Sequence, residues 1–138
     1  MRLQLALNVT DLEQAIAFYS KMFGTPVNKR KPGYANFAIA DPPLKLVLFE
    51  VPGSAERLNH LGVEVSGEEE VAEATQRLGS AGLELAVEEG TTCCYAKANK
   101  VWVKEPDGLA WEWYRVLGDS ETFGTTPEHL TAPPAASA

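Results

Sequence analysis

Positive charge is scarce in this sequence, and so are long hydrophobic runs. Its 138 residues contain 12 Lys and Arg against 19 Asp and Glu, which gives a net charge of −7. Nucleic acid and anionic membrane surfaces attract a basic face, so the charge balance argues against both as partners. No segment approaches the roughly 20 consecutive apolar residues that a membrane-spanning helix needs. We therefore expect a cytoplasmic protein with a small or cationic ligand.

Cysteine is also rare, and the only two cysteines, Cys93 and Cys94, are adjacent. A disulfide between neighbours closes a strained ring, so the pair favours a reducing compartment. Two reduced thiols side by side can chelate a soft, thiophilic centre. Threonines before the pair and lysines after it predict a loop that favours thiolates. An ordinary buried pair without function is the alternative.

Periodicity predicts one domain over residues 1–118, followed by a tail. The apolar content of 45% is sufficient for a core in a chain of this length. Residues 119–138 lack periodicity and contain little to bury, so we expect them to be disordered.

Within the domain, one pattern of strand, helix and three strands occurs twice, over about 2–51 and 57–117. Residues 2–9 alternate apolar and polar side chains, which predicts a strand. A capping-box spacing from Thr10 to Glu13 then predicts a helix over about 11–23.

The second copy keeps the spacing of the first. Three pairs of residues lie 56 positions apart: Gln4 with His60, Thr10 with Ser66, and Glu13 with Glu69. Such a duplication predicts an α+β fold in which two βαβββ modules form a curved mixed sheet around a cavity.

The end of the second copy reads as a hairpin. Residues 100–114 alternate and then turn at Pro106, Asp107 and Gly108. Glu112 therefore lies inside a strand between two tryptophans, where a carboxylate needs a partner because its desolvation is costly.

The faces of the central strands suggest a metal site. Eight apolar residues are expected to pack against the helices: Leu3, Leu5, Leu7, Leu61, Val63, Val65, Trp111 and Trp113. Gln4, His60, Glu112 and Tyr114 then share the opposite face. An amide oxygen, an imidazole and a carboxylate from three strands make a three-ligand site with open positions for a divalent metal.

Each of these residues also has a plain alternative. His60 alone would more often be a structural histidine, and Gln4 simply a polar strand residue. The duplication favours the metal site, because it places the two at equivalent positions. Val47 occupies the place in the first copy that Glu112 occupies in the second, so no fourth ligand is expected. His129 falls in the tail, where we expect it to be solvated.

Together these features resemble the vicinal oxygen chelate superfamily, which includes glyoxalase I, bleomycin-resistance proteins and extradiol dioxygenases. The resemblance covers about residues 2–117, and the segment from Glu105 to Glu112 is similar to the last-ligand strand of that superfamily. Within it, four segments resemble the carbon-arsenic lyases, which are grouped with cadmium-induced proteins: YANFAIADPPLKLVL (34–48), NHLGVEV (59–65), TCCYA (92–96) and KVWV (100–103).

The resemblance implies an iron(II)-dependent dioxygenase that uses dioxygen to cleave the carbon-arsenic bond of trivalent organoarsenicals such as methylarsenite. It implies that Gln4, His60 and Glu112 hold iron, which nickel, cobalt or zinc can replace in a purified sample. Cys93 and Cys94 would then bind arsenic. Tyr114 is either a catalytic hydrogen-bond donor or part of the cavity wall, and a homodimer that completes the cup stays open.

Two other function classes remain. A glyoxalase-like isomerase would use the metal for proton transfer without oxygen, but it has no use for a dithiol. A non-catalytic thiol protein that sequesters arsenite or cadmium needs the dithiol, but it has no use for the three-ligand set.

Overall fold

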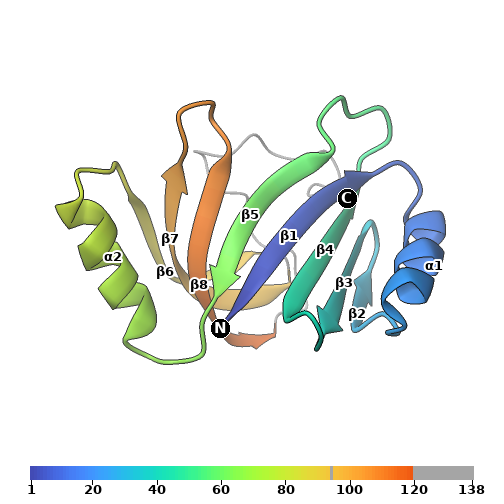
Figure 1. Cartoon of the computed structure of the whole chain (residues 1–138), viewed down its shortest axis with the longest axis horizontal. Coiled ribbons are helices and arrows are strands. Elements are labelled where there is room, and N and C mark those ends of the chain that lie inside the picture. Colours follow the sequence, from blue (N-terminus) through green and yellow to red (C-terminus); the bar gives the residue numbers. More distant parts are fainter. Residues whose placement is uncertain (94, 120–138) are drawn as a thin grey trace. The chain divides into compact units, whose positions relative to one another are not determined.

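The computed structural model describes residues 1–93 and 95–119 (Figure 1). These residues form two compact units, and the division falls inside one strand. The first unit comprises Arg2–His60, and the second begins at Leu61. The predicted disordered tail, residues 119–138, lies outside the described residues except for residue 119, which ends the last strand.

In the first unit, a helix follows the first strand and three strands complete the module. The elements are β1 (Arg2–Val9), α1 (Leu12–Phe23), β2 (Lys29–Lys31), β3 (Tyr34–Ile39) and β4 (Leu44–Glu50). Their strands lie in the order β2-β3-β4-β1. β1 pairs with β4 in parallel, whereas β3 is antiparallel to both of its neighbours.

The second unit repeats this arrangement. Its elements are β5 (Leu58–Glu64), which begins in the first unit, α2 (Glu70–Ser80), β6 (Ala86–Cys93), β7 (Ala96–Lys104) and β8 (Ala110–Asp119). The strand order is β5-β8-β7-β6, with β5 parallel to β8. The predicted α+β fold of two βαβββ modules is therefore confirmed.

Helix α1 begins one residue later than the predicted capping box. Asp11, not Thr10, is the N-cap, and its side chain accepts a hydrogen bond from the Gln14 amide at 3.0 Å. An aspartate there satisfies an amide that the first turn leaves without an intrahelical partner. The helix ends at Phe23, as predicted, and the following Gly24 has φ of 62°, the left-handed conformation that glycine adopts without cost.

Helix α2 contradicts the predicted capping box from Ser66 to Glu69. The helix begins at Glu70, and Glu69 at the N-cap makes no side-chain hydrogen bond. Instead, the Glu70 carboxylate accepts from the amides of Gly67 at 2.9 Å and Ser66 at 3.2 Å. Glu70, which caps α2, thus lies one residue after Glu69, the residue that the repeat pairs with Glu13.

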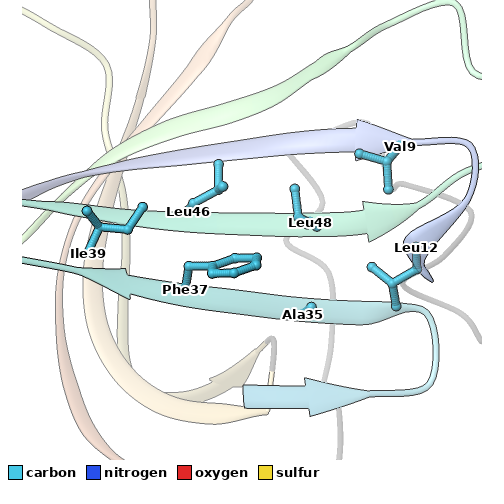
Figure 2. Close-up of a cluster of buried hydrophobic side chains, with 7 residues drawn as sticks. All are labelled: Val9, Leu12, Ala35, Phe37, Ile39, Leu46 and Leu48. Carbon is cyan, nitrogen blue, oxygen red and sulfur yellow. The ribbon is translucent and has the colours of Figure 1, made fainter. Parts of the chain in front are cut away.

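Each helix packs against a hydrophobic cluster of its own unit. Figure 2 shows the cluster of the first unit, which consists of Val9, Leu12, Ala35, Phe37, Ile39, Leu46 and Leu48. In the second unit the buried members are Val63, Val65, Val71, Leu78 and Val101. Both clusters leave the other face of their strands available to polar side chains.

The predicted apolar face is mostly correct. Leu5 and Leu7 pack against the first cluster, and Trp113 packs against the second. Leu61 and Trp111 are part-buried and are not among the described members of either cluster, and Leu3 is 56% exposed. Leu3 lies opposite Leu44, the first residue of β4, at the end of the strand pair.

None of the described helices is both long and apolar enough to cross a membrane.

Candidate metal centre and thiol site

Gln4 on β1 and His60 on β5 meet in the first unit, where both side chains are buried. Each is 5% exposed, and Gln4 Nε2 lies 3.2 Å from His60 Nε2. The equivalence that the 56-residue repeat predicted is thus a spatial contact. Two side chains that could each bind a metal therefore meet at the distance of a hydrogen bond.

The other ring nitrogen of His60 identifies the tautomer. His60 Nδ1 lies 2.8 Å from the side-chain oxygen of Asn59. An amide oxygen can only accept, so Nδ1 carries the proton and Nε2 carries the lone pair. Gln4 donates to that lone pair through its Nε2 amide.

An aromatic side chain, Phe49, lies beside His60. The Phe49 ring centre lies 6.4 Å from that of His60 and 5.7 Å from that of Tyr34. Val47 is buried at 3% exposure, with Ala6 opposite it on β1. An apolar residue therefore stands at the fourth position of the repeat, as predicted.

Glu112 lies on β8 in the second unit, and it is 4% exposed. Gly62 faces it on β5 and Trp102 faces it on β7. The Lys100 ammonium approaches Glu112 Oε1 at 3.3 Å and lies 5.4 Å above the Trp102 ring. This ion pair provides the partner that a carboxylate in an aromatic strand requires.

Tyr114 follows on the same face of β8 and is 3% exposed. Its hydroxyl donates to Glu64 Oε2 at 2.9 Å. Sequence reasoning missed Glu64, although one signal could have found it. Glu64 lies four positions after His60 on β5, and residues at even spacing lie on the same face of a strand.

Cys93 is half-buried and closes β6, where it pairs with Ala96 of β7. The predicted loop for the dithiol is therefore wrong for Cys93, because strand pairing extends to it. Cys94 lies outside the described residues. The next residue, Tyr95, has φ of 62°, so the hairpin turns sharply there.

Among residues 1–93 and 95–119, no three His, Cys, Asp or Glu side chains gather as a metal site. The predicted set differs in type, since one of its three members is an amide. Gln4 and His60 come together within the first unit, and Glu112 and Tyr114 lie on one face within the second. One metal shared by Gln4, His60 and Glu112 stays a prediction.

Comparison with known proteins identifies the family. Residues 3–113 match the model of the Glyoxalase/Bleomycin resistance protein/Dioxygenase superfamily. The chain is 62% identical over 128 residues to the cadmium-induced protein CadI of Mycobacterium tuberculosis strain H37Rv, covering 93% of this chain and 84% of CadI. It is 53% identical over 134 residues to a trivalent organoarsenical cleaving enzyme of Thermomonospora curvata, covering 96% and 89% of the two chains.

A solved structure agrees on the fold. The Mn(II)-bound glyoxalase from Novosphingobium aromaticivorans superposes with a TM-score of 0.62 at 17% identity, over 85% of this chain and 39% of that one. The repeated βαβββ module, the family model and the close relatives all lead to one assignment. The chain belongs to the glyoxalase/bleomycin resistance protein/dioxygenase superfamily, in the branch that holds CadI and the trivalent organoarsenical cleaving enzymes.

Proposed function

We propose that this protein is an iron(II)-dependent dioxygenase that cleaves the carbon-arsenic bond of trivalent organoarsenicals such as methylarsenite. The observation that carries the proposal is the convergence of Gln4 and His60 in a chain that also has vicinal thiols. Two relatives, 41% and 53% identical to it, are named trivalent organoarsenical cleaving enzymes. The superfamily is generally metal-dependent.

The donor set fits a divalent metal. His60 has an acceptor nitrogen at Nε2, and Gln4 can offer its amide oxygen after a rotation that removes its N–H group from His60. Glu112 adds a buried carboxylate. An N/O set with few charged ligands suits iron(II), and bound iron(II) supplies the redox chemistry that dioxygen requires.

Cys93 and Cys94 would hold the substrate. The two thiols would replace the two hydroxyls of methylarsenite, each thiol proton would leave with one hydroxyl as water, and arsenic would keep its bond to carbon. Both sulfurs are soft donors, which trivalent arsenic prefers over oxygen. The bond to be broken is then held in one place, which lowers the entropic part of the barrier.

The overall reaction balances without another reductant. Methylarsenite in its acid form, methylarsonous acid, and one dioxygen together contain the atoms of arsenous acid and formaldehyde. Arsenic stays trivalent, the methyl carbon loses four electrons, and dioxygen gains them. We propose that Tyr114 holds a proton on the site face of β8, and its hydrogen bond to Glu64 supports this role.

A second candidate is a non-catalytic thiol protein that sequesters cadmium or arsenite. The name of the M. tuberculosis relative, a cadmium-induced protein, favours it. Such a protein needs the two thiols, but it needs neither dioxygen nor a metal at His60.

Arsenite release separates the two candidates. Iron-loaded protein should release inorganic arsenite from methylarsenite in air, with one dioxygen consumed for each arsenite, and none under anaerobic conditions. Cys93→Ser and Cys94→Ser should keep their iron but lose about 100-fold or more of the release, because one thiolate loses the effective concentration of the second. Thr92→Ser, next to the pair, is the matched control and should release arsenite normally.

Either of two results would overturn the dioxygenase. One is release that continues without oxygen or in both serine variants. The other is tight methylarsenite binding without release under any metal, which favours sequestration.

A further inference from the structure

We propose that Asn59 and Asn8 are positioning residues that lock His60 in the tautomer with its proton on Nδ1. The lock keeps the Nε2 lone pair permanently available as a metal ligand. This inference rests on the proposed function, in which His60 binds the metal, and deepens it. All the groups involved belong to the first unit.

The argument begins at a backbone carbonyl. Asn8 Nδ2 donates to the carbonyl oxygen of Glu56 at 2.9 Å. A carbonyl can only accept, so the amide nitrogen of Asn8 must face Glu56. The oxygen of Asn8 then points away from it.

That oxygen determines the orientation of the next amide. Asn59 Nδ2 donates to Asn8 Oδ1 at 3.0 Å, so the oxygen of Asn59 faces the other way. Asn59 Oδ1 lies 2.8 Å from His60 Nδ1. Because Asn59 Oδ1 can only accept, His60 Nδ1 must donate. One fixed carbonyl thus orients two amides and one imidazole in sequence.

We call this chain of hydrogen bonds, from Glu56 through Asn8 and Asn59 to His60, the relay. Asn8 is firmly held at its start. It is 6% exposed, and its backbone N–H donates to the Arg57 carbonyl at 2.8 Å. Its own carbonyl accepts from Arg57 Nε at 3.3 Å. Backbone and side chain are therefore both attached to the segment that leads into β5, which leaves the amide no freedom to turn over.

The relay has a consequence for metal binding. Without it, a neutral imidazole can carry its proton on either nitrogen, and only one of the two forms offers Nε2 to a metal. Hydrogen bonds that fix the far nitrogen of a metal-binding histidine are typically worth 10–100-fold in metal affinity. The amide of Asn59 should be worth a similar factor here.

Nitrogen-15 NMR of the metal-free protein tests the tautomer directly. His129→Gln removes the only other histidine, so one imidazole remains to be observed. The spectra are recorded at about pH 8, where an ordinary imidazole is neutral. The wild-type ring should show its proton on Nδ1, and Asn59→Leu, similar in shape but without an acceptor, should show a mixture of both forms. Asn59→Asp keeps the acceptor and should keep the proton on Nδ1.

Zinc titration, which requires no turnover, supplies the second readout. Asn59→Leu should bind Zn²⁺ about 10–100-fold more weakly than wild type. Asn8→Leu should also lose affinity, because the Asn59 amide can then turn over, but the loss should be smaller because Asn59 itself remains. Asn28→Leu is the matched control: it breaks another amide pair of the first unit, with Asn36, and should change neither readout.

A proton on Nε2 in the metal-free wild type would overturn the proposal, and this measurement requires no variant to fold. Unchanged tautomer and zinc affinity in Asn59→Leu would overturn it as well. Neither readout uses an arsenical, so a failure of the proposed carbon-arsenic cleavage is visible separately, as the absence of arsenite release.

Discussion

Lys100 and Glu112 form an ion pair in which each side chain is only 6% exposed. Removing one partner of such a pair typically destabilises a protein by about 3–5 kcal/mol, since the remaining charge stays in a poorly solvated place. A divalent cation at Glu112 would supply positive charge to the same carboxylate. The stability of the metal-free protein should therefore depend on Lys100 more than the stability of the metal-bound protein does.

We expect Lys100→Met to lower the free energy of unfolding of the metal-free protein by about 3–5 kcal/mol. With saturating Zn²⁺ the loss should be clearly smaller, because ligand binding adds stability to the folded state and the metal opposes the charge of Glu112. Urea unfolding with and without zinc measures both values.

Lys97→Met is the control, since Lys97 is an exposed lysine of the same strand. It should change stability by no more than about 0.5 kcal/mol. An equal loss in Lys100→Met with and without zinc would show that the metal does not meet Glu112.

Residues that repeat could be predicted, and residues that pair across strands could not. Gln4 and His60 are paired by their equivalent positions in the repeat, and the structure places their side chains 3.2 Å apart. The donation from Tyr114 to Glu64 depends on the register between β5 and β8, which no local pattern in the sequence specifies. The partner of Tyr114 therefore had to come from the structure.

At the scale of elements, the two helix starts show how a repeat can diverge. Helix α1 is capped by the side chain of Asp11, and α2 by the backward reach of Glu70 to two amides. Both carboxylates also lie near the positive end of the helix dipole.

Glu70→Ala should therefore destabilise the protein by about 1 kcal/mol, the usual value of a lost cap. Glu69→Ala should have a much smaller effect, because Glu69 makes no side-chain hydrogen bond at the N-cap that it occupies. The midpoints of urea unfolding compare the two. Equal losses would mean that negative charge near the helix, rather than the hydrogen bonds of Glu70, stabilises α2.

Strand β6 shows why some element boundaries escape the sequence. The sequence pattern predicts a strand over residues 83–88 followed by a loop with the cysteines, whereas β6 runs from Ala86 to Cys93. The register between β6 and β7 shifts between Glu88 and Thr91, and such an irregularity interrupts the alternation on which strand prediction depends. Without that period, the segment leading to Cys93 reads as a loop.

At the scale of the whole molecule, both modules are complete by residue 119. Apart from Cys94, every candidate site residue lies within the described part of the chain. Residues 120–138 of the predicted tail lie outside that part, so their lack of a role in the fold and the site stays a prediction.

Deleting residues 120–138 should change the free energy of unfolding by no more than about 0.5 kcal/mol. Zinc affinity and arsenite release should equal those of the full chain. A loss of zinc affinity in the shortened protein would assign the tail a role in the metal site, and a loss of arsenite release alone would assign it one at the thiols.

The division of the chain after His60 also sets an order in time. The hydrogen-bond partners of His60 described above, Gln4 and Asn59, together with Asn8 behind them, all precede it in the sequence. During synthesis at about 5–20 residues per second, Glu112 is added several seconds after His60. Under the proposed ligand set, metal binding at full strength therefore has to await the synthesis of β8, which carries Glu112.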